Sequence, residues 1–430
     1  MGRPLELNPD RLFPSDRAQR GIARALYDEV AELPIVSPHG HTDPRWFATD
    51  EPWTDATSLL LAPDHYLYRM LYSQGVDLDR LGVPSRAGAP ATDPRAAWRL
   101  FAEHYHLFRG TPSRLWLDHV FAEVFGIDVR LDAGTADRYY DLIVDKLSRA
   151  EFRPRALFDR FRIDFLATTE GAEADLSHHH AIHRSGWGGR VVTTYRPDGV
   201  IDVEHEAFGP AMARFAELTG EDVGSWTGYL AAHRKRRADF RAAGATATDH
   251  GHLTARTANL SPAECETLFA SHGRDKGADM PGRTEYVGAL KPMLDAVGNE
   301  PDLTVILFTL DESTYARELA PLAGHYPCLK LGPAWWFHDS PEGMRRFREM
   351  TTETAGFYNT VGFNDDTRAF LSIPARHDVA RRVDCAFLAR LVAEHRLEDW
   401  EAAELALELT SGLVRRAYRI DQPAAQLAAA

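Results

Sequence analysis

The sequence predicts an α/β protein, a distorted (β/α)₈ TIM-type barrel with a helical insertion after the first strand. Short apolar runs alternate with long helical patterns, which is typical of parallel strands joined by helical crossovers. Several of these runs end in residues that carry chemistry, and in such a barrel these residues gather at the carboxyl ends of the strands. The length of 430 residues is enough for one barrel with insertions.

The first predicted strand covers residues 33–38 and, with an N-terminal helix before it, makes up a first segment of residues 1–43. It leads directly into His39 and His41. Side chains at positions i and i+2 of a strand point to the same side, so both imidazoles can face one metal ion. The pattern is weak by itself, because the chain has 19 histidines and an ordinary surface pair is the alternative.

Residues 44–162 follow this strand and are too long for an ordinary connection between a strand and a helix. We expect a helical insertion subdomain that contributes residues to the site. It contains His65 and Tyr66, an imidazole and a phenol that together can transfer protons. The alternative is a plain helix start capped by Asp64.

The remainder of the barrel and the C-terminal helices are assigned to residues 163–430. Six further strands are predicted, at residues 163–168, 191–195, 245–249, 303–308, 328–331 and 360–363. An eighth strand is not found, because residues 271–277 are typical of a loop and residues 286–297 of a helix. Residues 376–420 are predicted to form two helices, and residues 422–430 a frayed tail.

Chemically active side chains are expected just past several of these strands. Thr169 and Glu170 follow one strand, and Arg196 follows the next. Arg196 can hold a carboxylate through two parallel hydrogen bonds, or it can pair with a nearby acid such as Asp198 or Glu204. Both interpretations stay open at this point.

Aromatic and imidazole side chains follow two more strands. Trp335 and its neighbour Trp336 can wall a sugar-sized pocket or serve as ordinary core. The segment Asp249-His250-Gly251-His252 supplies either a second pair of metal ligands, as in a two-metal hydrolase, or groups that support the site and contact the substrate. The run of three histidines at residues 178–180 has no strand before it, and we interpret it as an exposed helix.

The last predicted strand leads to Asp366, a carboxylate that can complete a metal site with His39 and His41. A set of histidine and aspartate ligands suits zinc or another first-row divalent ion better than calcium or magnesium. The sequence therefore predicts a metal-using enzyme whose ligands come from the two ends of the barrel.

Composition excludes several other classes of protein. The formal charge of −14 disfavours nucleic acid as a partner, and no apolar stretch is long enough to span a membrane. The three cysteines are odd in number and far apart, which indicates a reducing compartment. We therefore expect a cytoplasmic protein with a small-molecule substrate and no membrane or nucleic-acid partner; a homo-oligomer is compatible with the sequence.

Taken together, these segments resemble the uronate isomerase, or glucuronate isomerase, family of the amidohydrolase superfamily. The matching pieces occur in the same order over most of the chain. They are His39-Gly40-His41, Asp64-His65-Tyr66 with Gly75-Val76, Arg196-Pro197-Asp198, Ala247 to Gly251, Ala334 to Phe337 with Asp339 and Gly343-Met344, and Val361-Gly362 leading into Asp366, Arg368 and Phe370-Leu371-Ser372.

The resemblance implies a metal-dependent barrel that binds one divalent ion, zinc being the best candidate, through His39, His41 and Asp366. It implies that Arg196 and Arg368 bind the substrate carboxylate. The substrate site would also include Trp335 and His250 among its contacts.

The resemblance also implies the reaction. This is the interconversion of aldose and ketose hexuronates, D-glucuronate with D-fructuronate and D-galacturonate with D-tagaturonate, in sugar-acid catabolism. Moving a proton between carbon 2 and carbon 1 needs an acid and a base, and we assign proton transfer to Tyr66, His65 and Asp366 without ordering the steps.

One departure from the family pattern accompanies this resemblance. Family members carry a His-Ile-Gly-Ala-type segment followed by Arg-Asn after the Asp-His-Gly block, and only His272-Gly273-Arg274 stands near that place. Two other functions therefore stay open: a metal-dependent amidohydrolase acting on a lactone, ester or amide of a sugar acid, and a non-catalytic barrel that binds sugar acids.

Overall fold

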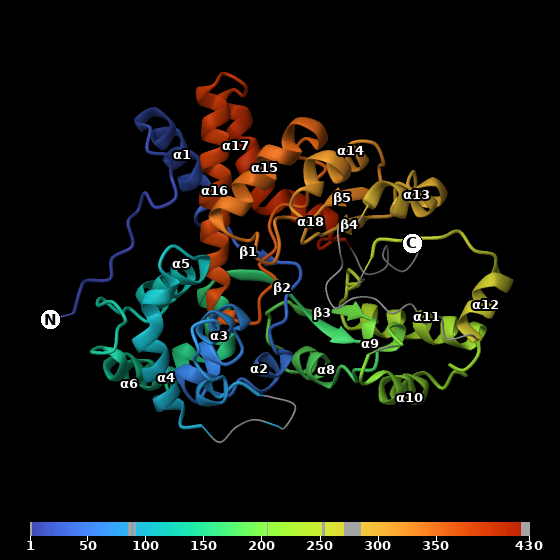
Figure 1. Ribbon diagram of the computed structural model, residues 1–430, viewed down its shortest axis with the longest axis horizontal. Helices are drawn as coiled ribbons and strands as arrows, with labels where there is room; N and C mark the ends of the chain where they lie inside the picture. The colour runs from blue at the N-terminus through green and yellow to red at the C-terminus, as the bar shows by residue number, and fades with distance from the viewer. Residues whose placement is uncertain are drawn as a thin grey trace. The chain divides into compact units, whose positions relative to one another are not determined.

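A computed structural model describes residues 2–84, 88, 92–203, 205–251, 254–270 and 285–422 of the chain (Figure 1). The chain forms two compact units. The first unit comprises Met1–Asp164, Asp339–Met344 and Asp365–Leu407, and the second comprises Phe165–His338, Arg345–Asn364 and Glu408–Ala430.

The first unit is mainly helical. Its longer helices are α1 (Arg17–Val30), α2 (Pro44–Thr49), α3 (His65–Tyr72), α4 (Pro94–His104), α5 (Pro112–His119), α6 (Ala136–Leu147), α7 (Pro154–Arg160), α16 (Ile373–Ala393) and α17 (Asp399–Leu407). Short 3₁₀ or π turns lie between them, at Thr57–Leu61, Asp79–Leu81, Tyr105–Phe108, Val120–Val124, Ala150–Phe152 and Phe370–Ser372. The predicted helical character of residues 44–162 is thereby confirmed.

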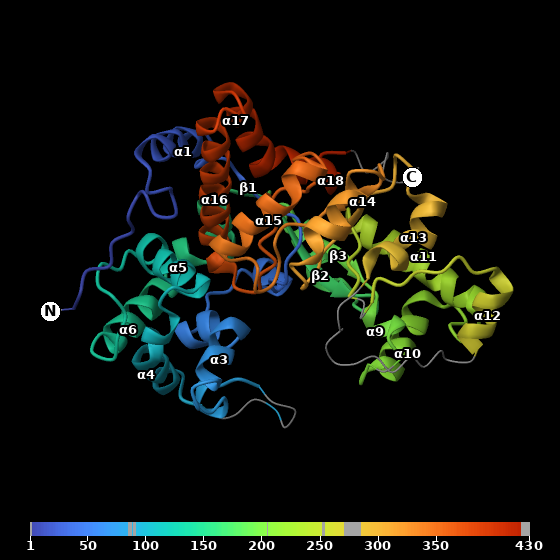
Figure 2. The ribbon, with the colours of Figure 1, turned by 45° about the horizontal axis from the view of Figure 1, so that its top comes forward.

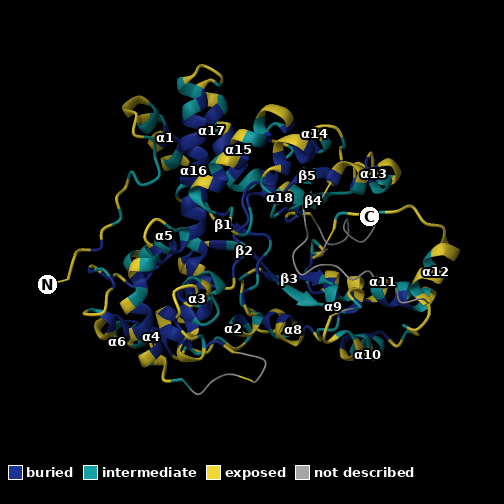
Figure 3. Ribbon diagram, viewed as in Figure 1, coloured by how far each residue is buried: buried dark blue, intermediate teal, exposed yellow. Residues whose placement is uncertain are grey.

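Two buried elements of the first unit, a strand and a helix, flank the segments that carry the candidate site. Strand β1 (Ile35–Ser37) is fully buried, and the amide of Ile35 donates to the carbonyl of Arg162 at 2.9 Å. Helix α16 packs along α1 (Figures 1 and 2), and most of its length is buried (Figure 3). The strand that leads to His39 and the helix that follows Asp366 therefore both belong to the interior of this unit.

The second unit is an α/β arrangement with parallel strands. Its elements are β2 (Ile163–Gly171), whose first two residues belong to the first unit, α8 (Ser177–Arg184), β3 (Val191–Arg196), α9 (Asp198–Ile201), α10 (Phe208–Thr219), α11 (Trp226–Ala242), α12 (Pro262–Ala270), α13 (Tyr286–Val297), β4 (Val305–Leu307), α14 (Ala320–Ala323), β5 (Leu329–Leu331), α15 (Pro341–Ala355) and α18 (Leu413–Ala417). Helix α15 begins in the first unit, and π turns occupy Tyr315–Leu319 and Glu408–Gly412.

The strands of the second unit pair in parallel. Strand β2 pairs with β3, with Thr168 opposite Thr193, and β4 pairs with β5, with Ile306 opposite Lys330. Single parallel bridges extend both pairs, from Tyr195 to Thr248 and from Leu331 to Thr360. Parallel pairs separated by helices are the connectivity that the alternating sequence pattern predicts.

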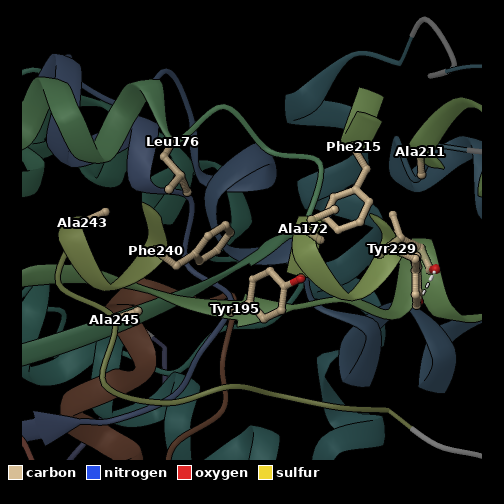
Figure 4. Close-up of a cluster of buried hydrophobic side chains, with 11 residues drawn as sticks. Ala172, Leu176, Tyr195, Ala211, Phe215, Tyr229, Phe240, Ala243 and Ala245 are labelled. Carbon is tan, nitrogen blue, oxygen red and sulfur yellow. Dashed lines mark hydrogen bonds between the residues drawn. The ribbon is translucent and has the colours of Figure 1, made fainter. Parts of the chain in front are cut away.

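A hydrophobic cluster lies between β3 and the helices of this unit (Figure 4). The ring of Tyr195 meets the ring of Phe240 edge to face, with 4.9 Å between the centroids, and the hydroxyl of Tyr195 hydrogen-bonds to Nδ1 of His233 at 2.7 Å. Phe215 is also fully buried in this cluster. The cluster fixes the strand that ends at Arg196.

Several predicted boundaries need correction. Thr169 and Glu170 do not follow a strand but lie within β2, because pairing with β3 continues to Gly171, and Arg196 is the last residue of β3. Residues 245–249 and 360–363 form single bridges in place of full strands. The C-terminal region contains α16, α17, a π turn and α18 where two helices were expected.

The predicted helix at residues 286–297 is confirmed as α13. The predicted loop at residues 271–277 and all but one residue of the tail lie outside the described residues. No strand occurs in the described part of residues 263–302, which holds α12 and α13. Among the described helices, none has the length and apolar content needed to cross a membrane.

Candidate metal centre and substrate site

The three predicted metal ligands meet in the first unit. The Nε2 atoms of His39 and His41 lie 3.4 Å and 3.1 Å from Oδ1 of Asp366. One ligand atom from each residue falls within 4.8 Å of the others, and within the described residues this is the only group of three or more such side chains that could hold a metal ion. Tetrahedral zinc with bonds of about 2.0–2.1 Å separates neighbouring ligand atoms by about 3.3 Å, so the observed spacing fits.

The backbone holds these ligands in place. The amide of His41 donates to the carbonyl of Thr367 at 3.0 Å, which joins the segment after β1 to the segment that carries Asp366. Asp366 has a φ of 39°, a left-handed conformation that is uncommon outside glycine. Such conformations cluster at functional sites, where the surrounding structure maintains them.

A glycine with a positive φ lies shortly before the segment that carries Asp366. Gly362 has a φ of +78°, and a Cβ at this position would lie 2.8 Å from the carbonyl oxygen of Leu409. Any larger residue would be strained and would also clash with this backbone.

The electrostatic environment favours an ionised carboxylate at Asp366. Burial alone would raise the pKa of Asp366, but the hydrogen bonds and charges of His39 and His41 outweigh it and hold the pKa well below its usual range. Carboxylate and imidazole are the donor types that a first-row divalent ion prefers, so these residues fit a metal of that class.

Tyr66 lies in the first turn of α3. The side chain of Asp64 caps this helix by accepting from the amide of Tyr66 at 2.9 Å, so the expected helix start with a capping aspartate is confirmed. The hydroxyl of Tyr66 donates to Oδ1 of Asp339 at 2.9 Å, and Nη1 of Arg376 donates to the other oxygen of Asp339 at 3.0 Å. Tyr66 is therefore both a helix residue and part of a polar network.

His65 is partly buried beside Tyr66, with 4.6 Å between the ring centroids. Burial lowers the pKa of His65, and the positive charges of Arg368 and Arg376 lower it further. His65 is therefore neutral near pH 7 and able to accept a proton. Arg368 is exposed, and no carboxylate of the described residues pairs with it.

Arg196 lies in the second unit and is paired with protein carboxylates. Its Nε donates to Asp198 at 2.7 Å, and its Nη1 donates to Asp249 at 2.9 Å. The salt-bridge interpretation of Arg196 is thus correct for Asp198; Glu204 lies outside the described residues. Part of the hydrogen-bonding capacity of this guanidinium is already used within the chain.

Trp335 and His250 also belong to the second unit. Trp335 is partly buried against Phe308, with 6.0 Å between the ring centroids, and Nε2 of His250 hydrogen-bonds to the Thr248 hydroxyl at 3.0 Å. His250 belongs to no group of potential ligands within the described residues, and His252, the other histidine of the expected second metal pair, lies outside them.

The run of histidines was interpreted wrongly in one respect. Residues 178–180 do lie on a helix, α8, but only His178 and His180 are exposed. His179 is buried, and its Nε2 lies 2.9 Å from the hydroxyl of Thr168 and 3.6 Å from the carboxylate of Glu170.

Reasoning from the sequence missed the roles of Asp339, Arg376 and Trp116. The guanidinium of Arg376 stacks on Trp116, with Cζ 3.6 Å from the ring centroid. Asp339 is 273 positions from Tyr66 in the sequence, and Arg376 lies near the start of α16, a helix that begins at Ile373 and is mostly buried. No local pattern joins these residues; the block Trp335 to Asp339 was the only available signal.

Comparison with known proteins agrees with this geometry. A family model described as glucuronate isomerase matches residues 17–272 and 263–410. The uronate isomerase of Phenylobacterium zucineum is 62% identical over 480 aligned positions that cover 100% of both chains, and that of Caulobacter vibrioides is 61% identical over 98% of this chain and 97% of its own.

Solved structures give the same result. A crystal structure of glucuronate isomerase from Caulobacter crescentus has a TM-score of 0.95 and 60% identity, and covers 98% of each chain. A uronate isomerase from Thermotoga maritima, with 23% identity over 96% of this chain and 99% of its own, shares the fold with a TM-score of 0.86. The predicted α/β fold of the TIM-barrel type is confirmed by these likenesses together with the parallel pairing of the strands.

The resemblance that rested on scattered motifs is therefore confirmed along the whole sequence. The two matches to the family model meet at residues 263–272, next to the place where the expected family segment was not found. The chain belongs to the glucuronate isomerase family.

Proposed function

We propose that this chain interconverts aldose and ketose hexuronates, D-glucuronate with D-fructuronate and D-galacturonate with D-tagaturonate. Family membership at about 60% identity to uronate isomerases supports the reaction class. The observation that carries the proposal is the convergence of His39, His41 and Asp366, whose ligand atoms lie within 4.8 Å of one another.

The proposed cofactor is one divalent metal ion, with zinc the best candidate. His39, His41 and Asp366 would hold it, and their donor types and spacing support an ion of the first-row divalent class. When bound, the ion supplies a Lewis acid that orients or polarises substrate oxygens.

Proton transfer between carbon 2 and carbon 1 falls to the protein's own side chains. Burial and neighbouring positive charges lower the pKa of His65 and keep it neutral near pH 7, the form in which an imidazole can accept a proton. Tyr66 offers a hydroxyl oxygen that is fixed by its hydrogen bond to Asp339. Asp366 is the third proposed proton-transfer group.

We assign the substrate carboxylate mainly to Arg368. Its guanidinium is exposed and has no carboxylate partner among the described residues, so it can offer two parallel hydrogen bonds to a ligand. Arg196 remains a proposed second contact, but its bonds to Asp198 and Asp249 limit the donors left for substrate. Trp335 and His250 are proposed as further contacts with the sugar.

The cellular setting is also a proposal. Cys265, Cys328 and Cys385 are all free thiols, which supports a reducing compartment, and we infer a cytoplasmic enzyme of sugar-acid catabolism. Its partner is a small-molecule uronate, with no nucleic acid or membrane. We keep residues 44–162 as an insertion subdomain between a segment of residues 1–43 and the barrel remainder of residues 163–430.

The test is an assay of the zinc-loaded protein with each hexuronate. We expect the ketose to appear, and we expect Arg368→Ala to raise KM because the substrate carboxylate loses its main partner. Hydrolysis of a sugar-acid lactone or amide without uronate turnover would support the amidohydrolase alternative. Binding of uronates without any turnover would support a non-catalytic barrel.

A further inference from the structure

In the first unit, the hydroxyl of Tyr66 is hydrogen-bonded to a buried ion pair. Asp339 and Arg376 are 7% and 4% exposed, and they pair at 3.0 Å. The second oxygen of Asp339 accepts the hydroxyl of Tyr66 at 2.9 Å. Burying two charges is costly unless each finds partners, so this pair is a specific feature of the fold.

The remaining contacts of Arg376 fix the direction of its guanidinium. Its Nε donates to the hydroxyl of Ser372 at 3.2 Å, and its flat face stacks on Trp116 with 3.6 Å to the ring centroid. Trp116 in turn meets the ring of Tyr66 edge to face at 5.7 Å. The phenol is therefore held both at its ring and at its hydroxyl.

We propose that Asp339 and Arg376 are positioning residues that fix the hydroxyl proton of Tyr66. A carboxylate only accepts hydrogen bonds, and Asp339 accepts from Arg376 through one oxygen and from Tyr66 through the other, so the proton of Tyr66 points at Asp339. Toward any further polar group, such as a substrate hydroxyl, the phenol oxygen then acts as an acceptor. This inference rests on the proposed function, because it assigns how Tyr66 meets the substrate.

The same guanidinium also reaches the segment that carries the metal ligand. Nη1 of Arg376 lies 3.4 Å from the carbonyl oxygen of Asp365, one residue before Asp366. The next helix residue, His377, hydrogen-bonds to the carboxylate of Asp365 at 3.0 Å. One turn of α16 therefore holds both the orientation of Tyr66 and the start of the ligand segment.

The sharpest variant is Asp339→Asn, which changes the chemistry with almost no change of shape. An asparagine at this position would turn its oxygen toward the charged Arg376, so its NH₂ group would face Tyr66. The hydrogen bond to Tyr66 would then reverse, with the phenol oxygen accepting. We expect kcat to fall about 10- to 100-fold while KM changes less than about threefold, as for an interaction that matters mainly in the transition state.

A double-mutant cycle separates positioning from general structure. If Asp339 acts through Tyr66, then Asp339→Asn in a Tyr66→Phe background should lower kcat less than about twofold further. An equal loss of kcat in both backgrounds would overturn the inference. Should Asp339→Asn fail to fold, Arg376→Lys is measured in the same two backgrounds. Its fall in kcat should likewise be smaller in the Tyr66→Phe background, provided that its bound metal is unchanged.

The control is Asp378→Asn, on the same helix. Asp378 also joins a tyrosine and an arginine, since it accepts from the hydroxyl of Tyr27 and pairs with Arg382 at 3.0 Å. We expect this change to lower the melting temperature and leave kcat unchanged. An equal fall in kcat for the control would show that any buried aspartate in this unit has the same effect.

A second readout does not depend on turnover. In protein labelled with 3-fluorotyrosine, the ¹⁹F resonance lost in Tyr66→Phe identifies Tyr66. We expect Asp339→Asn to move this resonance and Asp378→Asn to leave it in place; an unmoved resonance in Asp339→Asn would contradict the positioning role. Wild-type protein that turns over no uronate would instead count against the proposed function alone.

Discussion

Single buried side chains in this protein have environments that differ strongly from solvent, and His179 is the clearest case outside the metal site. Burial, together with the charges of neighbouring histidines, lowers its pKa to about 4. Its ring hydrogen-bonds to Thr168 beside Glu170, whose carboxylate accepts from the hydroxyls of both Thr168 and Thr193. This polar group lies under the parallel pair β2 and β3 and depends on a neutral imidazole.

This environment predicts a loss of stability in mild acid. In the unfolded chain His179 would bind a proton near its ordinary pKa of about 6.5, whereas in the folded state it binds one only near pH 4. The contribution of the neutral His179 to the free energy of unfolding is therefore complete above about pH 6.5. It declines as the pH falls toward 4. Between pH 7 and pH 5 the decline is about 2 kcal/mol.

Urea unfolding of wild type and His179→Gln at both pH values measures this effect. We expect the wild-type protein to lose about 2 kcal/mol more than the variant on going from pH 7 to pH 5. The exposed His325→Gln, which is not among the neighbours of His179, serves as the control and should follow wild type. Identical pH dependence in wild type and His179→Gln would show that the buried imidazole does not titrate as described.

At the scale of secondary structure, the apolar runs predicted correctly where strands lie in the sequence. They did not predict how many residues each strand contains. The runs at residues 33–38 and 303–308 became β1 and β4, each of three residues. The runs at residues 245–249 and 360–363 reduced to the bridges of Thr248 and Thr360. A strand ends where its partner stops pairing, and the sequence of one strand does not specify the other's register.

Helix α16 shows a similar limit. Its apolar spacing, with Val379 and Val383 four residues apart, predicts a helix with one buried face. The structure also buries charged residues of this helix, among them Arg381 and Arg382. Arg381 donates to the carbonyls of Ala31 and Leu33, and Arg382 donates to the carbonyl of Pro9 as well as to the nearby Asp378. No local pattern reveals the distant carbonyl partners.

Arg381 gives the prediction that belongs to this scale. Its guanidinium donates to the carbonyls of Ala31 at 2.8 Å and Leu33 at 2.9 Å, just before β1. Arg381→Ala would leave these carbonyls without their donor in a buried region. We expect a loss of about 2–4 kcal/mol in the free energy of unfolding, measured by urea denaturation.

The matched control is Arg17→Ala, at an exposed position of α1. It should change the free energy of unfolding by less than about 0.5 kcal/mol. If Arg381→Ala is as mild as the control, the contacts of α16 with the segment before β1 do not stabilise the fold.

For the molecule as a whole, the sequence was sufficient to predict that His39, His41 and Asp366 come together, and insufficient to predict the contacts around them. His39, His41 and Asp366 stand next to predicted strands, where barrel enzymes collect their chemistry. Asp339 has no such position, since it precedes a helix and acts on Tyr66 through contacts formed only in the folded chain.

The alignment to a family relative places gaps in this chain. The alignment to the Phenylobacterium relative runs over 480 positions, compared with 430 residues here. The family match divides at residues 263–272, near the place where neither the sequence nor the described residues supply an eighth strand. The ligand residues His39, His41 and Asp366 lie outside this region.

The most direct test of the whole account is a metal titration of the metal-free protein. Isomerase activity on a hexuronate should rise with added zinc and level off at one equivalent per chain, because we propose that His39, His41 and Asp366 form a single metal site. His39→Ala should show neither tight zinc binding nor recovered activity. A plateau at two equivalents, or full activity without any bound metal, would contradict the single-metal isomerase.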